Sequence, residues 1–170
     1  MNLASYIRNV PDFPIPGILF RDITPLLKDP EALRRAVEKM AEPWHNRDVD
    51  LIAAMEARGF MFGAAMAIRL DAGFVPVRKE GKLPWKTRQT RYSLEYRDDV
   101  LHIHEDALSQ GQKVLVVDDV IATGGTARAV VDLVEQLGGE VVGVQFLIEL
   151  TDLKGRELLD GHEVRTVITF

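Results

Sequence analysis

Residues 114–126 read Val114-Leu-Val-Val-Asp118-Asp119-Val-Ile-Ala122-Thr123-Gly124-Gly125-Thr126, and this stretch decides the fold. Its apolar beginning predicts a buried strand over residues 113–117. The spacing that follows predicts a helix over 126–137 and a further strand over 141–150. Because a strand, a helix and a second strand in this order form a right-handed crossover, the sequence predicts neighbouring parallel strands.

A ligand site is expected where the first of these strands ends, since ligands of parallel sheets bind at the carboxyl ends of strands. Asp118 and Asp119 present two carboxylates there. Thr123 and Thr126 add hydroxyl groups, and the two glycines between them let backbone N–H groups approach an anion closely. The helix N-terminus behind this loop carries about half a positive charge. Together these groups suit a sugar phosphate.

Two other nucleotide motifs are excluded by the same residues. The glycines are not followed by the Lys of a nucleoside-triphosphate loop, and the chain contains no Gly-x-Gly-x-x-Gly for a dinucleotide.

The rest of the chain alternates in a similar way between short apolar runs and helical segments. Strands are expected over residues 51–55, 74–77, 92–97 and 100–104, with a helix of small residues over 59–70. We therefore predict an α/β fold, with a mostly parallel twisted sheet flanked by helices on both faces. A length of 170 residues is usual for one domain, so residues 1–170 are expected to form a single domain.

Two segments lack usable periodicity. Five of the eight prolines fall within residues 1–30, which predicts an ordered but irregular lead-in. Residues 78–91 are polar and long enough to predict a functional loop. This second segment carries six cations and one acid, although the whole chain has a net charge of −5. Positive charge is thus concentrated in one place in an acidic protein.

Composition narrows the classes of function. The excess of acidic over basic residues argues against nucleic-acid binding as the main function, because such binding needs a basic surface. The chain has no cysteine, which excludes disulfides, thiolate metal sites and a cysteine nucleophile. Neither a signal peptide nor a membrane span is recognisable, so we expect a cytoplasmic protein without a membrane partner.

The stretch 114–126 resembles the phosphoribosyl-diphosphate signature of the type I phosphoribosyltransferases. Four further segments narrow the resemblance to the adenine phosphoribosyltransferases, and the likeness is collinear over nearly the whole chain. These segments are Phe13-Pro-Ile-Pro-Gly-Ile-Leu-Phe20-Arg21-Asp22, Glu56-Ala-Arg58-Gly-Phe, Arg78-Lys79-Glu80-Gly81-Lys82-Leu83-Pro84 and Tyr92-Ser-Leu-Glu95-Tyr96. The resemblance implies the type I fold, in which residues 1–30 form a small base-binding hood, and it implies a homodimer.

The resemblance also implies roles for individual residues. Asp118 and Asp119 would hold the ribose hydroxyls, while the 5′-phosphate would be wrapped by Ala122, Thr123, Gly124, Gly125 and Thr126. The diphosphate would be met by Arg58, Arg78, Lys79 and Lys82, with Arg78 reaching the site of the partner subunit. Lys86, Arg88 and Arg91 are expected to be solvated instead.

For the base, the resemblance implies that Phe20 and Val120 sandwich the purine and that the backbone around Leu19 and Arg21 reads its edge. Taken as a lone residue, Phe20 also fits an ordinary core position. Glu95 and Tyr96 would be catalytic together with Arg58. Glu95 would accept the proton that the purine loses, and Tyr96 would shield the site and contact the diphosphate. From spacing alone, Glu95 is also explained as a carboxylate on the face of a strand.

The reaction implied by the resemblance joins adenine to 5-phosphoribosyl diphosphate, giving AMP and diphosphate for purine salvage. Mg2+ would bind through oxygens of the substrate, with no direct protein ligand. Transfer to another purine base is the alternative within this class, and a regulator that senses phosphoribosyl diphosphate is the alternative outside it. A regulator would usually need an added DNA-binding segment, for which this chain is expected to have no room.

Histidines and methionines are assigned no chemistry. His102 and His104 would share one face of a half-exposed strand, and two histidines alone do not make a metal site. His45 and His162 are expected in solvent. The side chains of Met55, Met61 and Met66 are expected in the core.

Overall fold

The computed structural model describes residues 1–94 and 97–170, and its centre is a seven-stranded sheet with the order β5-β6-β4-β3-β7-β8-β9. The five strands from β4 to β9 in this order pair in parallel, whereas β6 runs antiparallel to β4 and β5 runs antiparallel to β6. The predicted mostly parallel sheet is therefore confirmed. The strands are β3 (Leu51–Met55), β4 (Gly73–Lys79), β5 (Thr87–Leu94), β6 (Arg97–His104), β7 (Lys113–Ile121), β8 (Glu140–Glu149) and β9 (Val164–Thr169).

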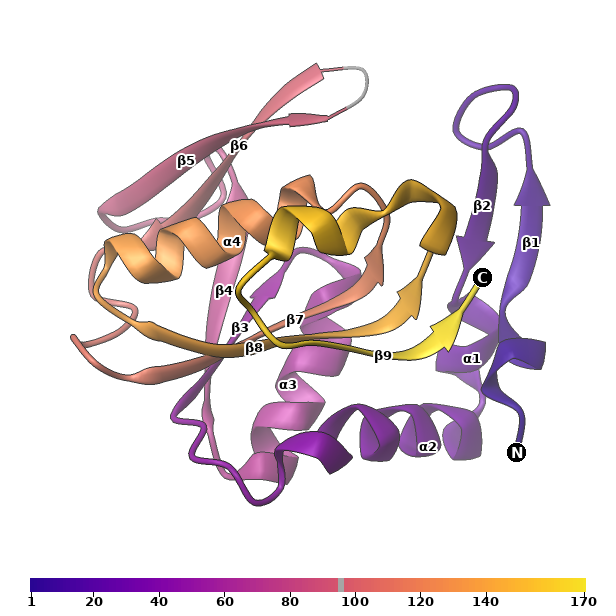
Figure 1. The fold of residues 1–170 in the computed structure, drawn as a ribbon, viewed down its shortest axis with the longest axis horizontal. Helices are drawn as coiled ribbons and strands as arrows, with labels where there is room; N and C mark the ends of the chain where they lie inside the picture. The colour runs from indigo at the N-terminus through magenta and orange to yellow at the C-terminus, as the bar shows by residue number, and fades with distance from the viewer. Residues whose placement is uncertain (95–96) are drawn as a thin grey trace.

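Helices cover both faces of this sheet (Figure 1). On one face α1, α2 and α3 pack against residues such as Ile52, Leu115 and Leu147. On the other face α4 and the short helix η4 pack against residues such as Val116 and Phe146. The helices are η1 (Leu3–Tyr6), α1 (Thr24–Lys28), α2 (Pro30–Ala41), η2 (Glu42–Trp44), α3 (Arg58–Leu70), α4 (Gly125–Gln136), η3 (Thr151–Leu153) and η4 (Gly155–Leu159).

The hood, residues 1–30, is more regular than predicted. Its two strands, β1 (Arg8–Pro11) and β2 (Leu19–Asp22), form a separate antiparallel sheet, with η1 before it and α1 after it. Pro14 and Pro16 lie between the two strands, and Pro11 is the last residue of β1. Pro25 and Pro30 lie in the first turns of α1 and α2, where a proline does not interrupt the hydrogen bonding. In Figure 1 the hood strands stand beside the carboxyl end of β9, and Arg21 of the hood lies over the ring of the C-terminal residue Phe170.

The prediction of a long loop over residues 78–91 is wrong. β4 continues to Lys79 and β5 begins at Thr87, so a much shorter connection joins them. β5 is held by its antiparallel register with β6, in which Thr87 lies opposite His104 and Gln89 lies opposite His102. Because residues 87–91 of β5 are all polar or charged, this part of the strand has no hydrophobic alternation to reveal it, whereas its end lies within the strand predicted over 92–97.

Three side chains lie in other surroundings than predicted. Met61 is 43% exposed on α3 and is not in the core. His162 is not free in solvent, because its Nε2 lies 3.5 Å from Glu135 Oε1. His102 is buried, and its Nδ1 lies 2.9 Å from the Thr87 hydroxyl.

A buried polar contact fixes the helical layer to β8. Trp44 Nε1 donates a hydrogen bond of 2.9 Å to Gln145 Oε1, and neither residue exposes more than 1% of its surface to solvent. Gly143, two residues before Gln145, leaves room for the Trp44 ring, since a Cβ there would lie 2.7 Å from the ring atom Cζ3. No helix among residues 1–94 and 97–170 has both the length and the apolar character needed to cross a membrane.

Candidate active site

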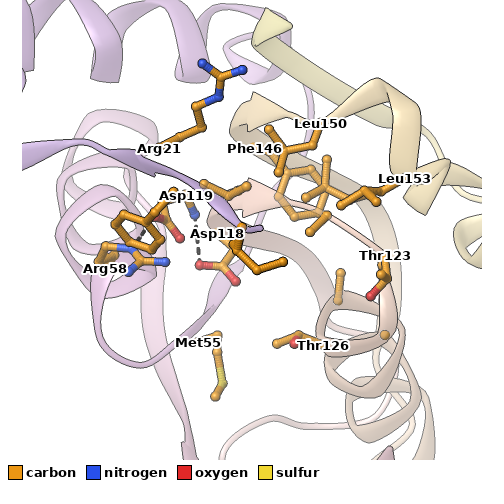
Figure 2. A pocket seen from close by; sticks show the side chains of 18 of the residues that line it. Arg21, Met55, Arg58, Asp118, Asp119, Thr123, Thr126, Phe146, Leu150 and Leu153 are labelled. Atoms are coloured by element: carbon orange, nitrogen blue, oxygen red, sulfur yellow. Dashed lines mark hydrogen bonds and ion pairs between the residues drawn. The ribbon is translucent and has the colours of Figure 1, made fainter. Parts of the chain in front are cut away.

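A cleft of about 960 Å3 lies at the carboxyl ends of β3 and β7, between the hood and the main sheet (Figure 2). Its lining comes mainly from segments far apart in the sequence: the hood, the end of β3, the end of β7 with the following loop, and the segment after β8, with single residues from β4, β5 and β8. Crossover connections bring these segments together because they place the carboxyl ends of parallel strands at one edge.

Asp118 and Asp119 lie within β7, which extends to Ile121 and so is longer than predicted. Both residues line the cleft. Asp119 is only 4% exposed, and its carboxylate forms an ion pair with the Arg58 guanidinium. Asp118 Oδ1 accepts a hydrogen bond of 2.8 Å from the Asp119 backbone N–H. Two adjacent carboxylates are thereby held with separate partners.

The Asp118 carboxylate is poorly solvated. It lies against the first turn of α3, where a Cβ on Gly59 would be 2.7 Å from Asp118 Oδ1. This loss of water and the charge of Asp119 raise the pKa of Asp118 well above its usual value. A glycine at 59 is required for this approach, since any larger residue would push the carboxylate away.

Arg58 connects the carboxylates to the hood. It is the first residue of α3, and its side chain remains 45% exposed while its Nε donates to Asp119. Its Cζ atom also lies 5.3 Å from the centre of the Phe20 ring, within cation–π range. Figure 2 shows Arg58 beside Asp119 at the side of the cleft.

The loop Ala122–Thr126 passes from β7 into α4 and lines the cleft. Gly124 has a φ of 87°, a left-handed conformation that favours glycine, and it is the N-cap of α4. No side chain caps this helix, so its first N–H groups have no capping acceptor. Thr123 and Thr126 carry hydroxyl groups on the same side of the cleft (Figure 2). An N-terminus of this kind is suited to bind a phosphate.

The hood contributes an apolar side to the cleft. Phe20 is half-buried and packs edge-to-face on Phe13, with 5.1 Å between ring centres. Leu19 and Val120 also line the cleft. The Arg21 side chain turns away from the carboxylates (Figure 2): it donates to Asn9, and its Cζ lies 4.0 Å above the Phe170 ring.

The chain is similar to known proteins over its whole length. The family model described as a phosphoribosyl transferase domain matches residues 26–169. The adenine phosphoribosyltransferase of Symbiobacterium thermophilum is 58% identical over 170 residues, which cover 100% of both chains. This chain belongs to the adenine phosphoribosyltransferase family.

The crystal structure of the Thermoanaerobacter pseudethanolicus adenine phosphoribosyltransferase has a TM-score of 0.96 at 54% identity, with 99% of this chain and 98% of that chain covered. A Saccharomyces cerevisiae adenine phosphoribosyltransferase, solved in complex with adenine and an iminoaltritol bisphosphate, has a TM-score of 0.91 at 39% identity and covers 97% of this chain and 96% of its own.

Most of the site residues predicted for this family come together in the one cleft. Those that line it are Leu19, Phe20, Arg21, Arg58, Lys79, Asp118, Asp119, Val120, Ala122, Thr123, Gly124, Gly125 and Thr126. Their individual roles stay predictions.

The basic residues of the 78–82 segment that are predicted to bind the diphosphate fall into two groups. Lys79 lines the cleft, and its Nζ lies 3.1 Å from Asp99 Oδ2. Arg78 and Lys82 are not part of the lining. Arg78 instead lies 3.3 Å from Glu56 Oε2 and donates to the Lys82 carbonyl oxygen. Glu95 and Tyr96, predicted to be catalytic, lie outside the described residues.

Sequence reasoning missed two parts of the site. Glu56 lines the cleft and accepts the Lys79 backbone N–H at 2.6 Å, which ties the ends of β3 and β4 together. Phe146, Leu150 and Leu153 add a second apolar wall opposite the hood (Figure 2). The signal for Glu56 was its place directly after a buried strand. The wall residues gave no signal, because nothing in an apolar strand end separates a lining residue from a core residue.

Proposed function

We propose that this protein transfers the phosphoribosyl group of 5-phosphoribosyl diphosphate to adenine, which gives AMP and diphosphate and returns free adenine to the nucleotide pool. One observation carries this: a carboxylate pair, an uncapped helix N-terminus and an apolar hood line the same cleft. They match, in that order, a ribose, a 5′-phosphate and a purine. The family of the chain agrees with this reading.

The sugar and its phosphate would be held by β7 and the loop after it. Carboxylates accept hydrogen bonds from neighbouring hydroxyl groups, so Asp118 and Asp119 suit the ribose 2′ and 3′ positions. The 5′-phosphate would lie on the N–H groups of residues 122–126. The negative field of the pair would also stabilise a ribose ring that becomes electron-poor as the bond to diphosphate breaks.

In the transfer itself, N9 of adenine forms a bond to C1′ of the ribose while the bond from C1′ to the diphosphate oxygen breaks. The electron pair of that bond leaves with the diphosphate, and N9 loses its proton. We assign the proton to Glu95 and the shielding of the closed site to Tyr96. Arg58 and Lys79 would meet the diphosphate from this subunit, and positioning with charge neutralisation would supply most of the rate.

Adenine would lie between Phe20 and Val120, with its edge read by the backbone near Leu19 and Arg21. Because hypoxanthine exchanges the donor and the acceptor on that edge, two groups would be mismatched. Each mismatch costs about 1–3 kcal/mol, so a preference for adenine of roughly a hundredfold or more is expected. Residues 1–30 would thus act as the base-binding part of one domain that spans residues 1–170.

Mg2+ belongs to the proposal as an ion carried by the substrate. It would bind through the diphosphate and ribose oxygens of the substrate, with no direct protein ligand, since the Asp119 carboxylate is already paired with Arg58. Among residues 1–94 and 97–170, no group of three or more His, Cys, Asp or Glu side chains is placed to hold a metal ion. When bound, Mg2+ neutralises charge on the diphosphate.

A homodimer is also proposed. The outer face of α3 carries Met61 and Ile68, which are 43% and 86% exposed. A second copy of the chain would cover this apolar face, and Arg78, which lies outside the cleft of its own subunit, would then serve the partner's site. Sedimentation equilibrium should show a dimer, and the variant Ile68→Glu should shift it toward monomer; a monomeric native protein would contradict the proposal. A cytoplasmic location stays a prediction.

The central test is formation of AMP from adenine and 5-phosphoribosyl diphosphate with Mg2+, followed by competition with hypoxanthine and guanine. Activity should fall strongly in Asp118→Asn, while Asp48→Asn, at an exposed site away from the cleft, serves as the matched control. Absence of AMP above background would refute the function, and equal efficiency with hypoxanthine would refute the choice of adenine.

A further inference from the structure

We propose that the segment Thr151–Arg156 positions the phosphate-binding loop and that Gly155 is the residue through which it acts. The inference rests on the proposed function, because it takes the loop 122–126 as the site of a 5′-phosphate. Gly155 does not line the cleft, so its effect on the ligand would be exerted through the loop backbone.

The contact between Gly155 and the loop is backbone against backbone. A Cβ on Gly155 would lie 3.0 Å from the Gly124 nitrogen and 2.8 Å from Ile121 Cγ1, and closer still to the Ala122 carbonyl oxygen. A Cβ on Gly124 would in turn overlap the Gly155 carbonyl. A side chain can turn aside from a collision, but neither of these backbones can. Both glycines are therefore required by their mutual approach.

Gly155 is held in place from the other side by its neighbour Arg156. The guanidinium binds Glu149 at the end of β8 through two hydrogen bonds of 2.6 and 2.7 Å, and it donates a third, of 2.7 Å, to the Val164 carbonyl oxygen. Glu149 is 8% exposed, and hydrogen bonds from Arg156 keep its pKa below the usual value. Forked pairs of this kind fix geometry as well as energy.

Two backbone hydrogen bonds complete the attachment. Leu150 N–H donates to the Ile121 carbonyl at 3.0 Å, directly before the loop, and Thr151 N–H donates to the Phe170 carbonyl at 2.9 Å. In Figure 1 the gold segment that precedes β9 lies beside α4. The loop is thus enclosed between β7 and a braced segment from the far end of the chain.

The chemical effect is preorganisation. A loop whose N–H groups already point at the phosphate position loses less conformational freedom on binding, and the ligand is held more tightly for that reason. If Gly155 is displaced, the Gly124 N-cap and the first turn of α4 move with it, although every group that contacts the phosphate is still present.

The test measures binding of ribose 5-phosphate by calorimetry, since this probe has neither a base nor a diphosphate. Gly155→Ala should raise its dissociation constant at least about tenfold, a loss of roughly 1.4 kcal/mol. The KM for adenine, measured at saturating 5-phosphoribosyl diphosphate, should change less than about threefold. Arg156→Lys keeps the charge but loses the fork, and should weaken ribose 5-phosphate binding in the same direction.

Gly143→Ala is the matched control. It places a methyl group against the Trp44 ring, in the helical layer away from the cleft, and should lower the melting temperature while ribose 5-phosphate binding stays within about twofold of native. A folded Gly155→Ala with native affinity would overturn the inference, as would an equal loss in Gly143→Ala. If Gly155→Ala does not fold, native affinity in Arg156→Lys overturns it instead. Native protein that binds no ribose 5-phosphate would refute the proposed function, which separates the two failures.

Discussion

Replacement of Asp118 by Asn should make the protein more stable while it weakens use of 5-phosphoribosyl diphosphate. The Asp118 carboxylate is poorly solvated, lies beside the Asp119 charge and has a raised pKa, so the fold holds this charge at a cost. Asp119 has the same chemistry but is paired with Arg58. The two aspartates should therefore respond differently to loss of charge.

The size of the effect follows from the contacts. An Asn at 118 can still accept the Asp119 N–H, and the weaker neutral acceptor costs about 1 kcal/mol. Removal of a poorly solvated, half-buried charge next to a second carboxylate relieves more than this, because even part of the several kcal/mol that a buried ion costs exceeds the loss of the hydrogen bond. We expect a net gain of about 1–2 kcal/mol in the free energy of unfolding, or roughly 2–8 °C in melting temperature.

The gain should depend on pH. Because the pKa of Asp118 is raised in the folded protein, the folded state binds its proton more tightly than the unfolded state. The charge therefore lowers stability fully only above the raised pKa, and this cost disappears as pH falls toward the ordinary pKa of aspartate. The advantage of Asp118→Asn over the native protein should be present at neutral pH and vanish in acid.

The assay is urea unfolding of the native protein, Asp118→Asn and Asp119→Asn across this pH range, with the KM for 5-phosphoribosyl diphosphate measured in parallel. Asp118→Asn should be the more stable of the two variants at neutral pH, because Asp119→Asn also loses its pair with Arg58. The KM of Asp118→Asn for 5-phosphoribosyl diphosphate should rise about tenfold or more, because roughly one charged hydrogen bond to the substrate is lost. If Asp119→Asn is as stable as Asp118→Asn, the account of the two carboxylates is refuted.

Three further outcomes are expected. Glu95→Gln should lower turnover far more than the melting temperature, and native turnover would remove Glu95 from the proton transfer. Trp44→Phe leaves the buried Gln145 oxygen without its donor and should cost about 2–4 kcal/mol of stability in denaturant unfolding, with both KM values unchanged. Leu153→Ala opens the apolar wall of the cleft and should raise the KM for adenine severalfold; unchanged adenine kinetics in this variant would place the base elsewhere.

Much of the fold could be predicted because burial leaves a plain pattern. β3 is found at the predicted residues, 51–55; α3 begins one residue earlier than predicted, and β8 is displaced by one residue at each end. These elements bury apolar residues in the sheet or against it, where the periodicity of side chains is strict. Only the end of β5 fell within a predicted strand, 92–97; its first part was missed for the opposite reason, since the polar run 87–91 is held by hydrogen bonds to β6 rather than by an apolar face. β9 carries few buried residues and was not anticipated at all.

The candidate site could be predicted where it is local in sequence. The stretch from Asp118 to Thr126 places its carboxylates and its loop without reference to the rest of the chain. Leu153 and Gly155 depend instead on a fold that returns the chain to β7 after β8, and no local pattern reports such a meeting. Lys79 lies at the cleft, whereas its neighbour Arg78 lies beside Glu56. This difference also depends on the pairing between strands, which no local pattern reports.

Within residues 1–94 and 97–170, β5 is the outermost strand on its side of the sheet, and its charges there have an expected role apart from ligand binding. Arg88 and Arg91 are exposed on a strand whose outer N–H and C=O groups have no neighbouring strand in the sheet. Such an edge can recruit a strand from another molecule, and charged side chains are a common natural protection against this kind of aggregation. We therefore expect these two arginines of the basic segment to oppose aggregation at this edge as well. Removal of these two charges is expected to promote self-association even where the chemistry of the cleft is intact.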